Sequence, residues 1–331
     1  MTGVRQGAAR VSRRRDEIAA AQFAADVQYY LTQDPRQLPS RYLYDSLGSA
    51  LFEAICRLPW YRITRAEERL LMNHGAEVLR ELAPLSAIVE LGSGSGEKLR
   101  MLVSRGGPRS HPLQVHLVDV SWSALETSAR ALESVADVLV TPHHASYEEG
   151  LREARGRLDV EGRALVLLLG SNIGNFDPPG AEAFVRAVRS LLRPGDALLV
   201  GADLVKPERE LHLAYDDPLG VTAAFNRNLL VRINRELGGD FDLGEFGHQV
   251  VWNESESRVE MHLVSRSAQR VRVEAARIAF TMEEGERIWT ESSYKYQPDE
   301  IVRLLEPAAF RLAMQWVDPE DQFALTLVEA V

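Results

Sequence analysis

Glycines at alternate positions follow an apolar run and an acidic residue in the stretch from Ile88 to Gly96, which reads IVELGSGSG. The apolar run predicts a buried strand, and the residues after it predict a helix. Glycines allow a sharp turn between the two and leave the backbone uncovered, so a ligand can lie against it. The N–H groups of the helix N-terminus would face that ligand. We therefore expect a ligand-binding turn, with an ordinary tight turn as the alternative.

A second acidic residue, Asp119, ends the next predicted strand. A dinucleotide site would require the spacing G-x-G-x-x-G, but Glu97 stands at the position of the third glycine. The looser pattern E/D-x-G-x-G-x-G is typical of S-adenosylmethionine (SAM) methyltransferases, in which an acid after the second strand binds the ribose. A carboxylate can accept two hydrogen bonds from a ribose diol. The spacing favours a methyl-donor site over a nicotinamide-dependent oxidoreductase.

The elements that position these residues alternate between strand and helix from Ile88 to Val200. Within this region, residues 164–169 form a continuous apolar run, which indicates a strand buried on both faces. This alternation predicts a doubly wound parallel sheet. Upstream, Thr64 and Glu67 have the spacing of a capping box and predict the start of a helix.

A different pattern follows Lys206, with helical segments first and then period-two alternation over residues 249–282, which predicts antiparallel strands. Two last strands, at residues 310–316 and 322–328, predict an antiparallel hairpin that completes the parallel sheet. We expect an α/β fold with a SAM-binding domain and a second α+β substrate-binding domain. The expected division is a disordered basic arm at 1–15, a SAM-binding domain at 67–205 and 296–331, and a substrate-binding domain at 16–66 and 206–295.

Composition excludes several classes of function. The 331 residues carry a formal net charge of −10, which disfavours nucleic acid as a partner. No apolar stretch is long enough to span a membrane, and the start of the sequence lacks the apolar core of a secretory signal. Cys56 is the single cysteine, so no internal disulfide can form, and we expect a cytoplasmic location. The histidines show no metal-ligand spacing, so we expect no metal site.

Polar residues follow the apolar run in the segment Gly170 to Phe176, which reads GSNIGNF. Ligands of doubly wound sheets bind outside the carboxyl ends of the strands, so a methyl acceptor is expected here. An asparagine side chain both donates and accepts hydrogen bonds, which suits a zwitterion such as an amino acid. A polar turn without a ligand is the alternative.

From about residue 20 onward, the sequence closely resembles the L-histidine Nα-methyltransferases of ergothioneine biosynthesis. The resemblance is carried by YDSLGS at 44–49, ELGSG at 90–94 with Glu97-Lys98, GSNIGN at 170–175, AYDD at 214–217, GVTAAFNRN at 220–228, INREL at 233–237 and TESSYK at 290–295. It implies the class I SAM-dependent methyltransferase fold with a Rossmann-like sheet, and SAM as the methyl donor.

The resemblance also implies roles for single residues on the donor side. The residues implied in SAM binding are Tyr44, Gly92, Lys98, Asp119, Ser146 and Tyr147. Asp119 would bind the ribose, and Ser146 and Tyr147 would flank the adenine. Ser146 departs from the family, which usually has aspartate at this position, and a serine accepts a hydrogen bond from the adenine amino group more weakly.

On the acceptor side, Asn175 and Tyr215 are implied to hold the α-carboxylate and amino group of histidine. The other implied substrate residues are Tyr61, Met261, Glu291, Ser292 and Ser293. Glu291 and Ser293 would read the imidazole, because residues two apart on a strand project to the same face. From the residues alone, an exposed strand acid and core tyrosines are the alternative interpretations.

The implied reaction is the transfer of three methyl groups from SAM to the α-amine of L-histidine, giving trimethylhistidine (hercynine) and S-adenosyl-L-homocysteine, by a monomer. One alternative is a methyltransferase of the same family that acts on another amine, such as tryptophan. Two alternatives of other classes are a nicotinamide-dependent oxidoreductase and a non-catalytic binding protein.

Overall fold

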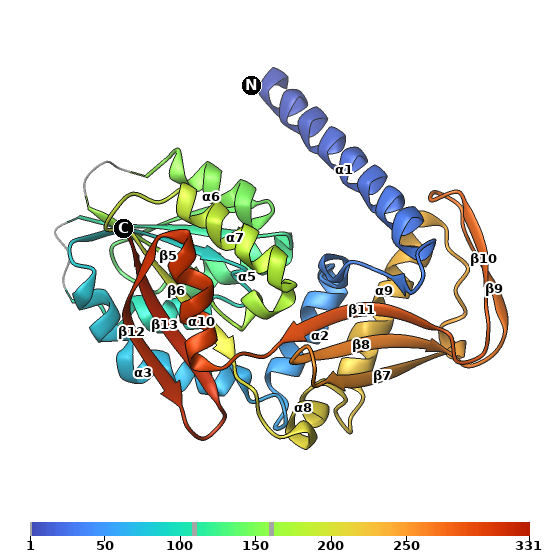
Figure 1. Ribbon diagram of the computed structural model, residues 1–331. Helices are drawn as coiled ribbons and strands as arrows, with labels where there is room; N and C mark the ends of the chain where they lie inside the picture. The colour runs from blue at the N-terminus through green and yellow to red at the C-terminus, as the bar shows by residue number, and fades with distance from the viewer. Residues whose placement is uncertain (1, 108–110, 159–161) are drawn as a thin grey trace.

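The computed structural model of the chain describes residues 2–107, 111–158 and 162–331, and it contains two main β-sheets that lie side by side (Figure 1). The larger sheet consists of β2 (Leu85–Leu91), β3 (Leu113–Asp119), β4 (Val138–His144), β5 (Arg163–Leu168), β6 (Ala197–Asp203), β12 (Phe310–Asp318) and β13 (Phe323–Ala330). The smaller sheet consists of β1 (Arg36–Gln37), β7 (Phe246–Asn253), β8 (Arg258–Ser265) and β11 (Arg287–Tyr294).

The larger sheet has the strand order β12-β13-β6-β5-β2-β3-β4. Strands β2 to β6 pair in parallel, whereas β13 runs antiparallel to both β6 and β12. The predicted parallel sheet with a terminal antiparallel hairpin is therefore confirmed. The carboxyl ends of β2, β3, β5 and β6 meet at one edge, where the predicted ligand residues follow the strands.

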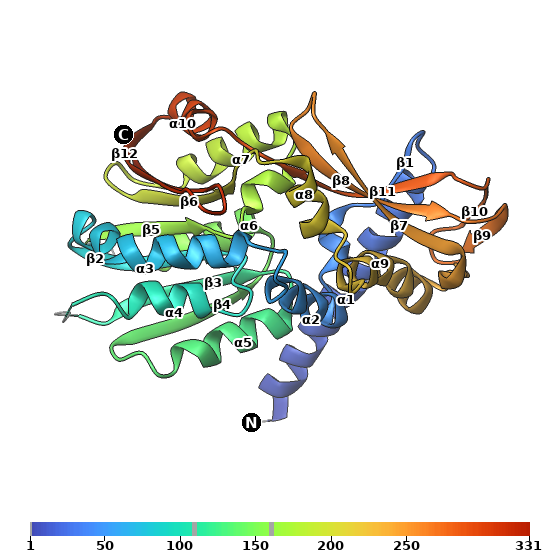
Figure 2. The same ribbon diagram turned by 90° about the horizontal axis from the view of Figure 1, so that it is seen from below.

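Helices cover both faces of this sheet (Figure 2). Alternate residues of each central strand enter different hydrophobic clusters, as for Ile88 and Val89 of β2. One cluster includes residues of α3 (Ile63–Glu81), α4 (Glu97–Val103) and α5 (Trp122–Leu132), and the other includes residues of α6 (Tyr147–Arg155), α7 (Pro178–Ser190) and α10 (Pro298–Leu305). This two-sided burial explains why β5 is a continuous apolar run.

The smaller sheet has the order β1-β11-β8-β7, in which β1 pairs with β11 in parallel, whereas β8 runs antiparallel to both β11 and β7. The pair β9 (Gln269–Val273) and β10 (Ile278–Met282) forms a separate two-stranded sheet. Three helices complete this half of the molecule: α2 (Ser46–Cys56), α8 (Glu208–Tyr215) and α9 (Val221–Leu237). Helix α9 packs against α2, β7 and β8, so the segment before residue 60 and the segment after 206 share one body.

Two expectations about the first 80 residues differ from the structure. Helix α1 runs from Thr2 to Leu31, so residues 2–15 belong to a helix rather than to a disordered arm, in keeping with the strong helix propensity of their alanine, arginine and glutamine residues. Helix α3 begins at Ile63 without a side-chain cap, so the predicted capping box of Thr64 and Glu67 is wrong. Because α3 spans residue 67, a domain boundary there would divide a helix. The wider division into two domains stays a prediction.

The chain passes between the two sheets three times, after β1, after β6 and after β11, and the segments that follow β6 and β11 pair with each other. Leu204 and Tyr296 form a parallel bridge. The Val205 N–H donates to the Tyr296 carbonyl at 3.1 Å, and the Tyr296 N–H donates to the Asp203 carbonyl at 3.1 Å. This pairing fixes where β11 leaves the smaller sheet relative to the end of β6.

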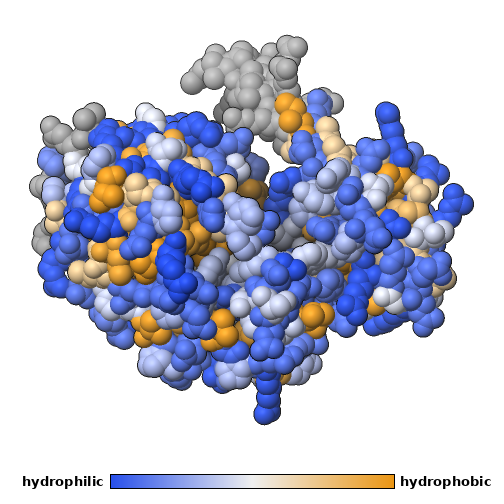
Figure 3. Space-filling model, in the orientation of Figure 1, coloured by the Kyte–Doolittle hydropathy of each residue, from blue (hydrophilic) through white to orange (hydrophobic). Residues whose placement is uncertain are grey.

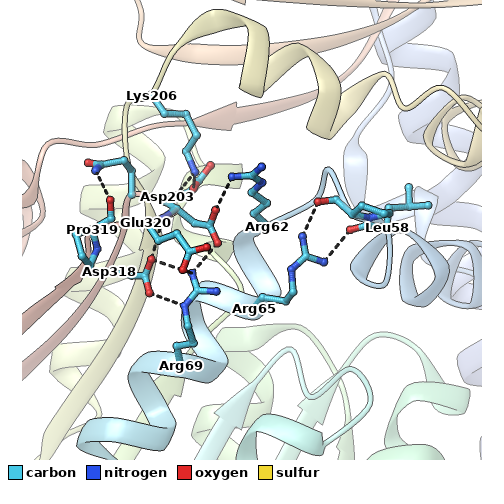
Figure 4. Close-up of polar contacts among 12 residues, drawn as sticks. Leu58, Arg62, Arg65, Arg69, Asp203, Lys206, Asp318, Pro319 and Glu320 are labelled. Carbon is cyan, nitrogen blue, oxygen red and sulfur yellow. Dashed lines mark hydrogen bonds and ion pairs between the residues drawn. The ribbon is translucent and has the colours of Figure 1, made fainter.

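A cluster of ion pairs ties α3 to the turn of the terminal hairpin (Figure 4). The Arg69 guanidinium donates to both oxygens of Asp318, at 2.8 and 2.9 Å, and to Asp321 at 2.6 Å. Arg62 reaches the other oxygen of Asp321 at 3.1 Å. Both aspartates are buried. Paired hydrogen bonds between a guanidinium and a carboxylate have a defined geometry, so they fix the position of α3 relative to this turn.

Replacing Arg69 with methionine is expected to lower the free energy of unfolding by about 2–4 kcal/mol, because two buried carboxylates lose a partner. Urea unfolding followed by circular dichroism measures this. The matched control is Arg186→Met, which removes an exposed pair with Glu182 and should cost about 0.5 kcal/mol or less. Equal losses in the two variants would show that the cluster has no special role.

Candidate active site

The glycine-rich turn lies between β2 and α4, and three of its glycines have backbone angles that favour glycine. Their φ values are +81° for Gly92, +49° for Gly94 and +73° for Gly96. A Cβ on Gly96 would lie 2.7 Å from the Cα of Ser128. The turn therefore requires glycine for both its backbone conformation and its close packing, and it exposes backbone at the edge where ligands bind.

The carboxylate of Asp119 lies beside this turn, at the end of β3. One oxygen accepts from the Gly94 N–H at 3.4 Å and the other from the Ser121 N–H at 2.8 Å. Burial raises the pKa of Asp119, and these backbone N–H groups act against that rise. Its contact with Gly94 places a hydrogen-bond acceptor at the turn, as a ribose-binding residue requires.

Two side chains pack directly against Gly92. A Cβ on Gly92 would lie 2.7 Å from the Asn172 amide nitrogen and 2.9 Å from the Tyr147 hydroxyl, so only glycine allows this close packing. Nearby, one oxygen of the buried Glu90 carboxylate has no hydrogen-bond partner among the described residues. Burial raises the pKa of Glu90 to about 8. Polar groups near the turn thus keep hydrogen-bonding capacity that other protein groups do not satisfy, which fits a polar ligand such as SAM.

The hydroxyl of Ser146 is engaged within α6. It accepts from the Glu149 N–H at 3.4 Å and donates to the Glu149 carboxylate at 3.1 Å, as an N-cap residue does. Tyr147, the next residue, reaches Gly92 as described above. The adenine contact of Ser146 therefore stays a prediction, and its capping role is what the structure shows.

Lys98 does not point freely into the site but pairs with Glu67, a residue that sequence reasoning assigned to a helix cap. The Lys98 ammonium lies 2.5 Å from Glu67, whose two oxygens both lie 2.9 Å from the Gly170 nitrogen. Burial opposes the charge of Lys98, but Glu67 outweighs it and raises the pKa of Lys98. A Cβ on Gly201 would meet Glu67 at 1.9 Å, so a glycine on β6 makes room for the carboxylate. The pair joins α3, α4 and the turn after β5.

A cavity lies between the carboxyl end of β5 and the smaller sheet, and the face of the molecule seen in Figure 3 is hollowed between these two halves. The cavity is lined by Tyr44, Phe52, Ile55, Tyr61, Gly170, Ser171, Asn172, Asn175, Ala214, Tyr215, Thr222, Phe225, Met261, Glu291 and Ser293. It therefore brings together six of the seven residues implied in substrate binding. It also contains Tyr44, which was implied in SAM binding.

Ser292 is the exception, because it projects to the opposite face of β11. The register of β11 on β8 shifts between Trp289 and Glu291, which places Glu291 opposite Met261. Such a bulge re-aims the side chains that follow it. Glu291 and Ser293 then face the cavity, next to Met261, while Ser292 is absent from its lining. The implied role of Ser292 in contacting the substrate does not agree with this geometry.

Tyr215 is held at both ends. The ring of His248 contacts the Tyr215 carbonyl at 2.8 Å through Nε2 and the Asn226 amide at 3.0 Å through Nδ1. The Tyr215 hydroxyl donates to Ser293 at 2.8 Å. The ammonium of Lys295 donates to the Tyr215 hydroxyl, also at 2.8 Å. A tyrosine fixed in this way is suited to orient a polar substrate.

Sequence reasoning missed two buried charged residues, Glu67 and Lys295. Glu67 stands in the apolar stripe of α3 between Ile63 and Leu70, and an acid in such a stripe could have indicated a buried partner. Lys295 follows β11, the strand that carries Glu291 and Ser293, and its burial depends on pairing with Asp203 across the two sheets. No local pattern could have shown that contact.

Comparison with known proteins agrees with this geometry. A family model described as "Histidine-specific methyltransferase, SAM-dependent" matches residues 23–330. The chain belongs to this family. It is 40% identical to the histidine N-alpha-methyltransferase of Mycolicibacterium smegmatis, over 93% of this chain and 95% of the relative, and 41% identical to that of Mycobacterium tuberculosis, over 91% and 93%. It is 28% identical to ergothioneine biosynthesis protein 1 of Neurospora crassa, over 77% of this chain and 31% of the relative.

Membership of the family establishes a SAM-dependent methyltransferase and rules against the nicotinamide-dependent oxidoreductase and the non-catalytic binding protein. Within the described residues, no helix is long and apolar enough to cross a membrane. The same part of the chain contains no group of three or more histidine, cysteine, aspartate or glutamate residues arranged to hold a metal ion.

Gly92→Ala is expected to abolish measurable SAM binding, because its Cβ would collide with the side chains of Asn172 and Tyr147 and its φ is positive, so the turn would have to shift. Isothermal titration calorimetry with SAM measures the loss. Gly107→Ala serves as the control, because a Cβ there would meet nothing within 4 Å. Unchanged SAM affinity in the Gly92 variant would rule out binding against this turn.

Glu291 provides a test based on pH. Burial raises its pKa from 4.5 to about 7, and Lys295 limits the rise. Between these pH values the folded protein binds more protons at this site than the unfolded chain, so the stability contributed at low pH is lost as pH rises towards 7. Glu291→Gln should therefore become more stable relative to the native protein between pH 5 and pH 8.

Thermal unfolding of the ligand-free protein at both pH values measures this difference. Glu274→Gln is the control, because this carboxylate lies on the surface with 75% of its side chain exposed. If the Glu291 and Glu274 variants respond alike to pH, the Glu291 carboxyl does not occupy a buried site.

Proposed function

We propose that the protein transfers three methyl groups in succession from SAM to the α-amino nitrogen of L-histidine. The observation that carries this proposal is the composition of the cavity at the carboxyl end of β5. Asn175 and Tyr215 can hold an amino acid backbone there, while Met261, Glu291 and Ser293 form an apolar and polar wall for a ring. The matched relatives named for histidine methylation support the same substrate.

The chemistry is a direct displacement. SAM supplies a methyl group on a sulfonium centre, which needs no covalent enzyme intermediate. The free lone pair of the α-amine forms the new N–C bond as the S–C bond breaks and S-adenosyl-L-homocysteine leaves. The products of the first and second transfers each release one proton before the next transfer, and the third transfer leaves a quaternary ammonium. Asn175 and Tyr215 orient the amine, and alignment of two bound reactants can contribute several kcal/mol to lowering the barrier. The buried setting of Tyr61 and Tyr215 excludes water from that space.

Aromatic rings make the cavity suitable for a growing cation. Tyr44 packs edge-on against Phe52 and Phe225, and Tyr61 packs edge-on against Tyr215. Aromatic faces attract quaternary ammonium groups, so the same rings can accept the methylated amine after each transfer.

Two finer statements belong to the proposal. The protein is proposed to act as a monomer. It acts in the cytoplasm, in keeping with a single cysteine and no internal disulfide. The division into a SAM-binding domain and a substrate-binding domain is supported by the two separate sheets.

Incubation of the protein with SAM and L-histidine is expected to give products heavier by one, two and three methyl groups. Mass spectrometry over a time course measures them, and omission of SAM is the control. Failure to detect any methylated histidine under conditions where SAM binds would contradict the proposal.

Calorimetric titration of single amino acids onto protein loaded with S-adenosyl-L-homocysteine tests the acceptor. L-Histidine should bind more tightly than L-tryptophan or L-tyrosine, because its ring can donate to Glu291 from one nitrogen and accept from Ser293 at the other, whereas indole only donates and a phenol does both through a single oxygen. Tighter binding of tryptophan would instead indicate a related methyltransferase with another amine as substrate.

A further inference from the structure

The ammonium of Lys295 lies directly behind the polar wall of the cavity. Its side chain is fully buried. Three oxygens surround its Nζ: the Tyr215 hydroxyl and the Ser293 hydroxyl, each at 2.8 Å, and the Asp203 carboxylate at 3.0 Å. An ammonium group has three N–H donors and no acceptor, so all three donors of Lys295 are used in these contacts.

The two hydroxyls contacted by Lys295 also contact each other. The Tyr215 O–H donates to the Ser293 oxygen at 2.8 Å. Ser293 therefore accepts one hydrogen bond from Lys295 and one from Tyr215. A serine hydroxyl has two lone pairs and one proton, so both of its acceptor positions are filled and only the donor remains. Because Ser293 lines the cavity, that donor is available to a ligand.

We propose that Lys295 is a positioning residue for specificity, which makes Ser293 a hydrogen-bond donor only and so selects a substrate ring with a bare nitrogen. The inference rests on the proposed function and deepens it. Glu291, two residues before Ser293 on the same face of β11, supplies the matching acceptor. The neutral imidazole ring of histidine has one N–H and one bare nitrogen, and it satisfies both groups.

This arrangement discriminates against rings of similar size. A ring with an N–H but without a bare nitrogen can bind Glu291 and leaves the Ser293 donor unpaired in a buried site. An unpaired buried donor carries the full cost of its lost hydration, whereas a well-paired one does not. Selection through unpaired polar groups is stronger than selection through shape alone. Without Lys295, the Ser293 hydroxyl could turn and the discrimination would weaken.

The structure also indicates a variant that separates this role from simple support. Lys295→Met keeps an unbranched side chain one atom shorter than lysine and removes the three donors. Asp203 would retain Lys206, whose ammonium lies 2.6 Å from its other oxygen, so the buried carboxylate keeps a charged partner. Ser293→Ala removes the donor itself and leaves Lys295 in place, and Ser293→Thr keeps a hydroxyl as the conservative variant.

The experiment compares L-histidine with the two pyrrolylalanines, in which one or the other ring nitrogen is replaced by carbon. Calorimetry with protein loaded with S-adenosyl-L-homocysteine gives the ratio of their dissociation constants. The native protein should favour histidine on the order of tenfold or more over the pyrrolylalanine that keeps its N–H at Glu291. Lys295→Met and Ser293→Ala should each reduce that ratio several-fold, and Ser293→Thr should preserve it.

The double variant should show the ratio of Ser293→Ala alone, because Lys295 acts through Ser293. A ratio unchanged in Lys295→Met, with both ligands weakened equally, would overturn the inference and leave Lys295 as packing support. If Lys295→Met does not fold, an unchanged ratio in Ser293→Ala overturns it as well. Failure of the native protein to bind or methylate histidine would instead contradict the proposed function. The two failures are therefore distinguishable, because only the second is seen in the native protein.

Discussion

The buried carboxylate of Asp203 joins the end of β6 to the strand that carries the polar wall of the cavity. It pairs with Lys206 at 2.6 Å and with Lys295 at 3.0 Å. Buried ion pairs gain little stability over apolar packing of the same volume, because both charges lose hydration. The contribution of the Asp203–Lys295 pair is to hold neighbouring side chains in position. Through Lys295 it fixes the hydroxyls of Tyr215 and Ser293 relative to the larger sheet.

A second buried carboxylate, that of Glu67, contacts the turn after β5 from the side of the glycine-rich turn. Its oxygens lie 2.9 Å from the Gly170 nitrogen, and it pairs with Lys98 near the start of α4. From the other side, the Ser171 hydroxyl accepts from the Asp203 N–H at 3.0 Å. The turn after β5 is thus held between the Glu67 carboxylate and the backbone N–H of Asp203. This explains how Asn175 can be placed between the glycine-rich turn and the substrate cavity.

Periodicity and the glycine spacing predicted the parallel sheet, the terminal hairpin and the turn at Gly92, because these depend on local patterns of burial and backbone angle. Strand alternation predicted that Glu291 and Ser293 share one face of β11. The same alternation places Ser292 on the opposite face, so its expected contact with the substrate was inconsistent with the strand pattern. Glu67 and Lys295 were missed for a different reason. Their partners are distant in sequence, so only the packing of α3 and of the two sheets brings them together.

The two halves of the site differ in what can change without disturbing the fold. The donor side uses backbone at positive φ and buried carboxylates, so its residues are constrained by the sheet itself. The proposed readers of the ring, Met261, Glu291 and Ser293, stand on paired antiparallel strands whose backbone hydrogen bonds do not depend on those side chains. Acceptor selectivity can therefore vary on this face while methyl-donor binding is kept. Lys295 is the exception, because its ammonium contacts both the wall of the cavity and the carboxylate at the end of β6.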